Sequence, residues 1–385
     1  MKQLLQNIKD GKTLINEAPV PQIDDNSVII KTSKTLISSG TEKILVNFGK
    51  QNFISKIKNN PDKVKDVYNK YKTDGFLNTI NAVNAKLDQP IPLGYCNVGK
   101  VIEIGSNVKS VKLGDRVLSN GQHAEYVKVF EKQCAAIPNE VSDNEAVYGV
   151  LGSISLHSVR LLKPTIGETF VVYGSGLTGL LASQILQANG CRVISIDINN
   201  QRNELAKKLG ALSINPQSQS VESFVMNSTN NLGADGVIIS TATTSDEIIN
   251  QSARILRKRG RIVLLGTAGL NINRNEFYKK EITFQVSCSY GPGRYDINYE
   301  EENNDYPLGF VRWTQQRNFQ TILNLIKEKK INTNILTTSS YAFKNISSQY
   351  SEIINDPNQI GVIIEYEHKN IASKTISVDG YKFSQ

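Results

Sequence analysis

The sequence GSGLTG at positions 174–179 has the residue types and spacing of a turn that binds phosphate groups. It follows an apolar, β-like run at 170–173 and precedes a helix-like stretch at 180–188. The first glycine permits a tight turn, the second lets the backbone approach a pyrophosphate, and the third lets the helix pack on the strand. The helix then points its N-terminus at the phosphates. We therefore expect a bound dinucleotide to contact Gly174, Gly176, Leu177, Thr178 and Gly179.

An acidic residue at the end of the next apolar run indicates which dinucleotide binds. Asp197 follows the run 192–196, where a carboxylate can accept hydrogen bonds from both hydroxyls of the adenosine ribose. It would also repel a 2′-phosphate, so NAD is expected rather than NADP. Arg202 could stack on adenine or support NADP, or it could be a surface charge at the start of a helix. Thr241 and Gly266 complete the predicted cofactor-binding set.

The elements that position this turn alternate between strand and helix. Apolar β-like runs at 170–173, 192–196, 236–239 and 261–265 are separated by helical stretches. Strands that are apolar on both faces are typical of a parallel sheet with helices on either side. The sequence therefore predicts a doubly wound α/β sheet of the Rossmann type.

The chain before this sheet resembles a small twisted barrel. Short β-like runs at 28–32, 98–105 and 113–117 are punctuated by glycines that suit tight turns. A helix at about 308–329 and a short strand at 361–364 follow the predicted sheet. We divide the chain into a barrel domain at 1–148, a Rossmann domain at 149–290, a return to the barrel domain at 291–366 and a tail at 367–385.

A helical insertion is expected at about 50–88. Its apolar residues recur at spacings near 3.6 in two stretches, which are broken at Asp74 and Gly75. The insertion could simply cover exposed core. It could also form a lid, because its two ends lie next to candidate active-site motifs.

Length and composition limit the classes of protein that remain. The 385 residues suit two domains, and 39% hydrophobic and 21% charged residues are ordinary for a globular protein. No apolar run approaches the roughly 20 residues of a membrane span, and the N-terminus lacks the apolar core of a secretory signal, so a cytoplasmic location is expected. The four cysteines form no CxxC pair, which argues against a disulfide framework and a structural zinc lobe.

The net charge of +8 does not by itself indicate a nucleic-acid partner. The densest lysines, at 50–72, alternate with apolar residues as on the solvated face of a helix, and no aromatic-plus-basic signature accompanies them. We expect no nucleic-acid or membrane partner. The charge is compatible with an anionic small-molecule substrate.

Several motifs resemble the medium-chain, alcohol-dehydrogenase-type reductases. VGKV at 98–101, GDRV at 114–117, AEY at 124–126 and IP at 137–138 look like their GroES-like barrel. The region 170–266 looks like their Rossmann domain. The resemblance implies an active site in the cleft between the domains and a homodimer or homotetramer.

Four further segments are similar to the first half of bi-domain oxidoreductases from surface-polysaccharide gene clusters. They are LDQP at 87–90, PLGYCNVG at 92–99, FQVSCSYGPGRYD at 284–296 and YPLGFVRWT at 306–314. The chain has no second Rossmann unit of the kind those fusions carry. This resemblance implies a sugar-derived substrate and a possible sugar-dehydrogenase partner chain.

Zinc-bearing relatives use Cys-x-Thr/Ser-Asp, Gly-His-Glu and a third cysteine near the domain junction. The corresponding positions here read SGTE at 39–42, GYC at 94–96 and Gly149, so we expect no metal. The resemblance places Thr41 at the hydroxyl position of the proton relay. Tyr95 takes the place of the ligand histidine and could donate its phenolic proton to a carbonyl oxygen. Its neighbour Cys96 fits a small core residue better.

Three more residues have expected roles near the cleft. His123 lies on a loop that enters the cleft in this architecture and is the best-placed titratable base, although a lone histidine is more often structural. Tyr290 and Arg294 would line the nicotinamide side of the cleft, where Arg294 could hold an anionic group. The same loop could instead form a subunit contact.

Together these features predict a zinc-independent, NAD-dependent oxidoreductase that interconverts a secondary alcohol and a ketone on a sugar or nucleotide-sugar. Two alternatives remain open. One is a quinone or enone reductase, which also needs no metal. The other is an NAD-binding subunit whose activity depends on a sugar-dehydrogenase partner.

Overall fold

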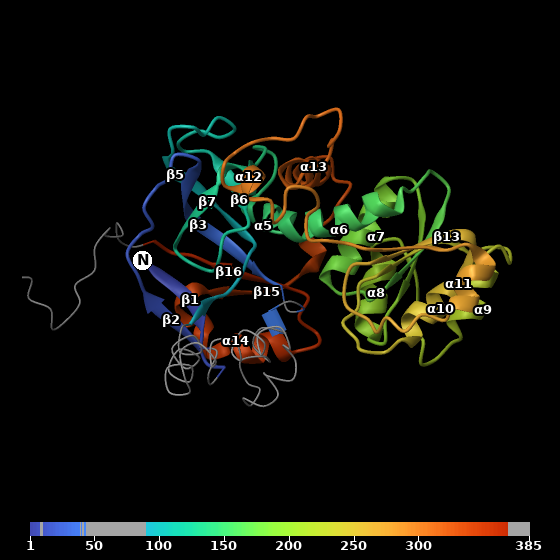
Figure 1. Cartoon of the computed structure of the whole chain (residues 1–385). Helices are drawn as coiled ribbons and strands as arrows, with labels where there is room; N and C mark the ends of the chain where they lie inside the picture. The colour runs from blue at the N-terminus through green and yellow to red at the C-terminus, as the bar shows by residue number, and fades with distance from the viewer. Residues whose placement is uncertain (8–10, 39, 41, 44–89, 369–385) are drawn as a thin grey trace, which may run out of the picture.

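The computed structural model describes residues 1–7, 11–38, 40, 42–43 and 90–368. The predicted helical insertion and Thr41 lie outside the described residues, and so does the predicted C-terminal tail except for its first two residues, 367 and 368. The described part forms two lobes, with strands β1 to β8 on one side and the sheet around β13 on the other (Figure 1). Helices α6 and α7 lie between them.

The second lobe is a six-stranded parallel sheet in the order β11-β10-β9-β12-β13-β14. Its central strands are buried, because helices cover both faces. The predicted doubly wound α/β sheet is therefore confirmed, and the two edge strands β11 and β14 complete it beside the four predicted runs. The strands are β9 (Thr169–Tyr173), β10 (Arg192–Ile196), β11 (Leu212–Ile214), β12 (Ala234–Ile239), β13 (Leu256–Leu264) and β14 (Thr283–Val286).

Helices connect these strands and join the two lobes. Gly152 of α6 lies against α13, where a Cβ atom would come within 2.8 Å of Ile322. The absence of a side chain therefore lets these two helices pack closely. The main helices are α6 (Gly149–Leu162), α7 (Leu177–Ala188), α8 (Asn200–Lys208), α9 (Val221–Ser228), α10 (Glu247–Ile255), α11 (Arg274–Lys280), α13 (Gln315–Lys327) and α14 (Ile346–Asn355), with short helices α5 (Asp143–Ala146) and α12 (Ile297–Glu300).

The first lobe is the expected barrel-like assembly of short strands. A larger sheet has the order β15-β16-β3-β5-β6-β8, with β7 paired to β3, and a smaller one has the order β2-β1-β4. Strand β16 pairs with β3 in the register Val362↔Ile37, so the end of the described chain completes the sheet that its beginning starts. The strands are β1 (Lys2–Gln6), β2 (Thr13–Glu17), β3 (Ser27–Ile37), β4 (Ile91–Pro92), β5 (Asn97–Ile104), β6 (Arg116–Ser119), β7 (Tyr126–Phe130), β8 (Cys134–Ala136), β15 (Thr337–Ala342) and β16 (Gly361–Glu365).

The helix predicted at about 308–329 begins later than expected. It starts at Gln315 because Thr314 is the N-cap residue and has an extended backbone. Pro307 and Gly309 precede it in a turn, in which the amides of Phe310 and Val311 donate to the Pro307 carbonyl. No helix in the described part of the chain is long and apolar enough to cross a membrane.

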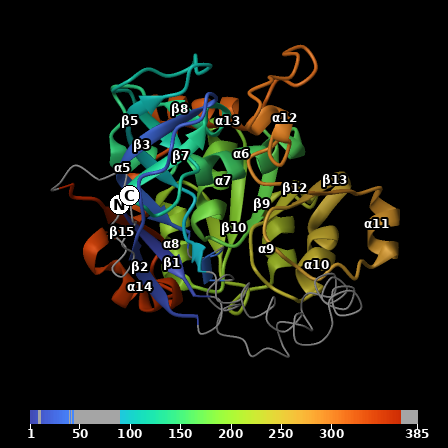
Figure 2. The ribbon, with the colours of Figure 1, turned by 60° about the vertical axis from the view of Figure 1, so that its left-hand side comes forward.

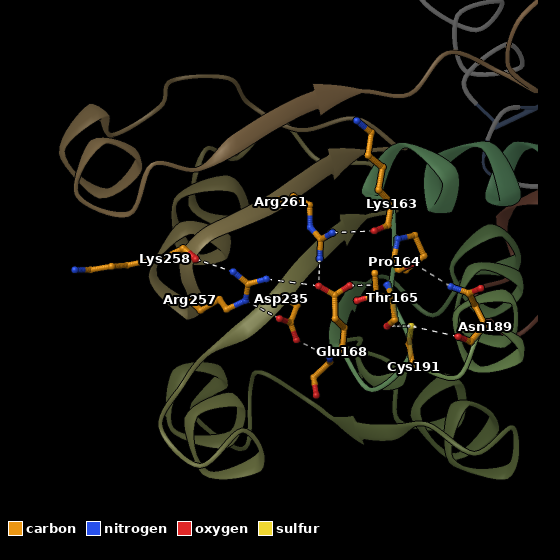
Figure 3. Close-up of polar contacts among 11 residues, drawn as sticks. Lys163, Pro164, Thr165, Glu168, Asn189, Cys191, Asp235, Arg257, Lys258 and Arg261 are labelled. Carbon is orange, nitrogen blue, oxygen red and sulfur yellow. Dashed lines mark hydrogen bonds and ion pairs between the residues drawn. The ribbon is translucent and has the colours of Figure 1, made fainter. Parts of the chain in front are cut away.

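Charged groups tie together the sheet edge that lies opposite the expected cofactor (Figure 3). Glu168, just before β9, forms ion pairs with Arg261 and Arg257 of β13. The Nε of Arg257 lies 2.6 Å from Oδ1 of Asp235, whose Oδ2 accepts a 2.8 Å hydrogen bond from the amide of Thr169. This network links β9, β12 and β13 at their amino ends, so its role is to hold the sheet.

Candidate active site

The glycine-rich turn has the geometry that its spacing predicts. Gly174 adopts φ +91°, which favours glycine. A Cβ atom on Gly179 would lie 1.8 Å from the Gly174 carbonyl oxygen, whereas nothing lies within 4 Å of the corresponding position on Gly176. The third glycine therefore permits close packing of helix and strand, and the second opens the backbone to a ligand. No side chain caps the first turn of α7, so its amides face this opening.

Asp197 lies against this turn at the carboxyl end of β10. It is 8% exposed, and its Oδ2 accepts a 2.7 Å hydrogen bond from the amide of Ser175. Its other oxygen accepts a 2.8 Å hydrogen bond from the amide of Asn199. The carboxylate is thereby fixed beside the phosphate-binding turn, where a ribose hydroxyl can reach it.

Arg202 lies near Asp197 and contacts the first lobe. Its Nη1 is 3.9 Å from Asp197 Oδ2, and its Nη2 donates a 2.9 Å hydrogen bond to the carbonyl of Pro357. The reading of Arg202 as a plain surface charge is therefore incomplete, because its guanidinium faces the acid of the predicted adenosine site. Its position is compatible with the alternative reading, contact with the adenosine end of a dinucleotide.

Two orphaned polar atoms lie at the same edge of the sheet. In the described part of the chain, Thr241 Oγ1 and Ser287 Oγ are buried without a hydrogen-bond partner. They follow β12 and β14, respectively. A buried hydroxyl without a partner is costly, so both atoms suit polar groups of a bound ligand. Ser287 was missed in the sequence, although its place directly after an edge strand of a Rossmann sheet was a usable signal.

The remaining predicted residues of the turn support this edge. The hydroxyls of Thr178 and Ser240 lie 2.8 Å apart. A Cβ atom on Gly266 would come within 2.0 Å of the Thr241 carbonyl oxygen, so glycine allows the ends of β12 and β13 to approach each other. The predicted cofactor-binding residues thus lie together at the carboxyl ends of the parallel strands. They fit a nicotinamide dinucleotide, with the pyrophosphate at the glycine turn.

Tyr95 is held by a short hydrogen-bonded chain. Its hydroxyl donates to Ser38 Oγ at 2.8 Å, and the amide of Ser38 donates to Glu42 Oε1 at 2.8 Å. Glu42 is completely buried. Ser38 and Glu42 lie on either side of Thr41 in the sequence, and sequence reasoning assigned no role to either. The structure therefore brings two further polar residues to Tyr95.

His123 does not face the cleft as expected. It is completely buried, with Nδ1 2.7 Å from Thr35 Oγ1 and Nε2 3.2 Å from Glu42 Oε2. Gly94 packs against the ring, since a Cβ atom there would come within 2.6 Å of it. Because both ring nitrogens are engaged, the imidazole buttresses Glu42 and is not presented to a substrate. This corrects its expected role as a general base.

The donor groups near Tyr95 do not fit a tetrahedral zinc site. Cys96, a buried free thiol, supplies one soft ligand, whereas a zinc site needs about three thiolate, imidazole or carboxylate ligands. His123 has no ring nitrogen to spare. Within the described ranges, no group of three or more His, Cys, Asp or Glu residues could hold a metal ion.

The two predicted substrate-binding residues behave differently from each other. Tyr290 is 4% exposed and packs edge-on against Phe319, and burial raises the pKa of its hydroxyl. Arg294 Nη1 donates to both oxygens of Glu300, at 2.8 and 3.0 Å. Its charge is therefore neutralised within its own segment, and the expectation that it is free to hold an anionic substrate group is corrected. Tyr290 packs into the core, so the expectation that it binds substrate stays a prediction.

Comparisons with known families agree with this geometry. Residues 178–302 match the family of zinc-binding dehydrogenases, and residues 66–159 match the GroES-like domain of alcohol dehydrogenases. The chain is 30% identical to D-guloside 3-dehydrogenase of Escherichia coli over an alignment of 275 positions, gaps included, that covers 68% of this chain and 73% of that protein. It is 23% identical to D-xylulose reductase of Saccharomyces cerevisiae over an alignment of 398 positions, gaps included, that covers 93% of this chain and 96% of that protein.

A solved structure shows the same fold. It is the 2R,3R-butanediol dehydrogenase of Bacillus subtilis, with a TM-score of 0.70 at 18% identity, covering 94% of this chain and 99% of that one. The glycine turn, the buried acid after β10 and the GroES-like lobe are therefore parts of one known architecture that uses a nicotinamide cofactor. The chain is a dehydrogenase of CH–OH groups and belongs to the medium-chain, zinc-type alcohol dehydrogenase superfamily.

Proposed function

We propose that the chain is an NAD-dependent dehydrogenase that interconverts a secondary alcohol and a ketone on a sugar or nucleotide-sugar without a catalytic zinc. The observation that carries this proposal is the Tyr95–Ser38–Glu42 chain at the place where zinc ligands are expected. The sugar is supported by the names of two relatives, a D-guloside dehydrogenase and a D-xylulose reductase. The resemblance to bi-domain oxidoreductases supports a role in polysaccharide synthesis.

The residues of the chain divide the work between binding and proton transfer. When bound, the nicotinamide ring would give or take the hydride. In the structure the one phenolic proton of Tyr95 is donated to Ser38 Oγ. During reduction Tyr95 would turn this proton to the ketone oxygen while the Ser38 hydroxyl donates to the phenolic oxygen in its place, and during oxidation both would move back. The contact with Ser38 Oγ, at 2.8 Å, fixes the direction of the phenolic oxygen. Buried Glu42 holds Ser38 through its amide, and His123 holds Glu42 in turn.

The preference for NAD rests on Asp197. Its carboxylate is 8% exposed and already directed at the glycine turn. A 2′-phosphate on the same ribose would lie within a few ångströms of that charge. At such separations, like charges repel by several kcal/mol in a partly buried site. Contact between Arg202 and Asp197 offsets part of this repulsion and leaves the site closer to neutral.

The test is turnover by matched variants. Tyr95→Phe keeps the ring and removes the proton donor, so we expect kcat to fall by about a hundredfold or more with little change in NAD affinity. Tyr295→Phe, at a tyrosine that is 70% exposed, is the control and should be silent. The assay offers polyols and nucleotide-sugars with NAD or NADP, after chelation and again after addition of zinc. Undiminished turnover of Tyr95→Phe would refute the assignment, and activity that depends on zinc would refute the metal-free mechanism.

The same assay separates the two alternatives. A quinone or enone reductase would reduce conjugated carbonyls and ignore polyols. A complex subunit would bind NAD but turn over no sugar until a sugar-dehydrogenase partner is added. The oligomeric state, expected to be a homodimer or homotetramer, is read by sedimentation of the same preparation.

A further inference from the structure

The backbone segment 287–291, directly after β14, has an unusual conformation. Ser289 has φ +48°, in the left-handed region that a non-glycine residue seldom adopts. Such a conformation persists only where surrounding contacts fix it, and residues of this kind concentrate at ligand sites. The segment begins on the sheet, where the amide of Ser287 donates a 2.8 Å hydrogen bond to the carbonyl of Leu264 in β13. Other contacts must therefore fix its far end.

This segment lies where the nicotinamide half of a dinucleotide is expected. The glycine turn after β9 would take the pyrophosphate, and Asp197 would place the adenosine ribose beside β10. Strands β12, β13 and β14 lie on the other side of β9, so the nicotinamide half belongs there. The buried hydroxyl of Ser287, without a hydrogen-bond partner in the described part of the chain, suits its carboxamide. This step rests on the proposed function, which makes the chain NAD-dependent.

A buried pair of side chains from two helices contacts the far end of the segment. Asn318 of α13 is completely buried, and its Nδ2 donates a 2.8 Å hydrogen bond to the carbonyl of Tyr290. Its Oδ1 accepts a 3.0 Å hydrogen bond from Nε of Arg160 on α6. The guanidinium carbon of Arg160 also lies 3.6 Å from the centroid of the Trp313 ring, which fixes the guanidinium by stacking. Because Arg160 can only donate, the amide oxygen must face it and the amide nitrogen must face the segment.

Helices α6 and α13 lie side by side, and the segment packs directly on both (Figure 2). A Cβ atom on Gly291 would lie 2.8 Å from Nδ1 of His157 on α6 and 3.1 Å from Nδ2 of Asn318. The amide of Gln315, the first residue of α13, donates a 2.9 Å hydrogen bond to the carbonyl of Pro292. The backbone therefore has no room to move toward the helices, and the hydrogen bond from Asn318 opposes movement away from them.

We propose that Asn318 is a positioning residue for the nicotinamide end of the cofactor. Oriented by Arg160, it fixes the carbonyl of Tyr290 and so sets the backbone from Ser287 to Tyr290 against the cofactor. Asn318 itself contacts neither cofactor nor substrate. Its loss therefore disturbs the nicotinamide end and leaves the adenosine end intact, whereas the loss of a merely stabilising residue would affect both ends alike.

The test compares the binding of two ligands to the full-length protein by calorimetry: NADH, and ADP-ribose, which lacks the nicotinamide. Asn318→Asp keeps an oxygen that accepts from Arg160 but loses the donor to the Tyr290 carbonyl, so it removes the contact with the segment alone. We expect the Kd for NADH to rise about fivefold, as for the loss of one hydrogen bond, and the Kd for ADP-ribose to stay within about twofold. The kcat should fall by about tenfold, because the ring is no longer held in line with the substrate.

Gln316→Met is the matched control, because Gln316 is a neighbouring buried amide on α13 that contacts the first lobe instead. Its Nε2 donates to the carbonyls of Glu131 and Cys134, at 2.8 and 3.0 Å. This variant should unfold at a lower temperature but keep the Kd for NADH. An unchanged Kd for NADH in Asn318→Asp would overturn the proposal, and so would equal weakening of both ligands or an equal effect of Gln316→Met. A wild-type chain that binds NADH but oxidises no alcohol would refute the proposed function and leave the binding comparison valid.

Discussion

Replacing Glu42 tests whether the buried chain around Tyr95 is held by hydrogen bonds or only by packing. Glu42 is completely buried, accepting from the Ser38 amide at 2.8 Å and contacting His123 Nε2 at 3.2 Å. Glu42→Gln keeps the shape. Its oxygen can still accept from Ser38, and its amide nitrogen can donate to Nε2 if the ring proton lies on Nδ1, toward Thr35.

Glu42→Leu, in contrast, removes the carboxylate and leaves the Ser38 amide and His123 Nε2 buried without a hydrogen-bond partner. Each unsatisfied group costs about 1–3 kcal/mol. We therefore expect Glu42→Leu to lower the free energy of unfolding by about 2–6 kcal/mol, and Glu42→Gln by about 1 kcal/mol or less. The apolar contacts of leucine raise the free energy of unfolding, whereas the lost hydrogen bonds lower it. A Leu variant that is less stable than the Gln variant therefore shows that the hydrogen bonds outweigh the apolar contacts.

The assay is urea denaturation followed by circular dichroism, with kcat measured on the same preparations. The Gln variant should keep a native-like midpoint and, since Ser38 stays in place, most of the activity. The Leu variant should unfold at a clearly lower urea concentration. If Glu42→Leu were as stable as Glu42→Gln, the hydrogen bonds of Glu42 would contribute nothing measurable to stability, and the view that Glu42 fixes Ser38 and Tyr95 would be wrong.

Two further predictions concern the cofactor and pH. Asp197→Ser should raise the Kd for NAD at least about tenfold, because it removes a charge-assisted hydrogen-bond acceptor, and should bring the Kd for NADP closer to that for NAD, because it removes the repulsion of the 2′-phosphate. Calorimetry with both cofactors measures the two Kd values, and an unchanged ratio between them would contradict the prediction. For Glu131, burial raises the pKa, but hydrogen bonds from Lys109, Ser110 and Asn303 outweigh it and lower the pKa below 4.5. The contribution of the Glu131 carboxylate to stability is therefore complete above pH 4.5 and is lost as the pH falls through its lower pKa in the folded state. Acid unfolding of Glu131→Gln should accordingly depend less on pH than that of the wild type, and an unaltered profile would count against this role.

The sequence was most informative where a function depends on residues close together in the chain. The turn at 174–179 and Asp197 belong to one strand–helix–strand unit, so their spacing predicts that they lie close together, as they do in the structure. His123 could not be read in this way. Its partners Thr35 and Glu42 come from a distant part of the chain, and only the packing of β3 against the loop before β7 brings them together.

Arg294 shows a second limit of the sequence. It lies in a segment without regular periodicity, where composition cannot tell a free charge from a neutralised one. The ion pair with Glu300 depends on the short helix α12, which no pattern in the sequence indicated. Arg160 lies on the well-defined helix α6, yet its contacts with Trp313 and with Asn318 could not be read from the sequence, because both partners come from a distant part of the chain.

The proposed acid–base group depends on the last part of the described chain. Thr35, which holds His123, lies on β3, and its hydroxyl is 3.2 Å from that of Tyr366. Strand β16, just before Tyr366, pairs with β3 along the register Ile364↔Thr35. The return of the chain after the Rossmann sheet thus supports the hydrogen bonds that lead through His123 to Tyr95. A cut between the two lobes would therefore remove more than the cofactor, because it would also leave the buried groups behind the proposed proton donor without their supporting strand.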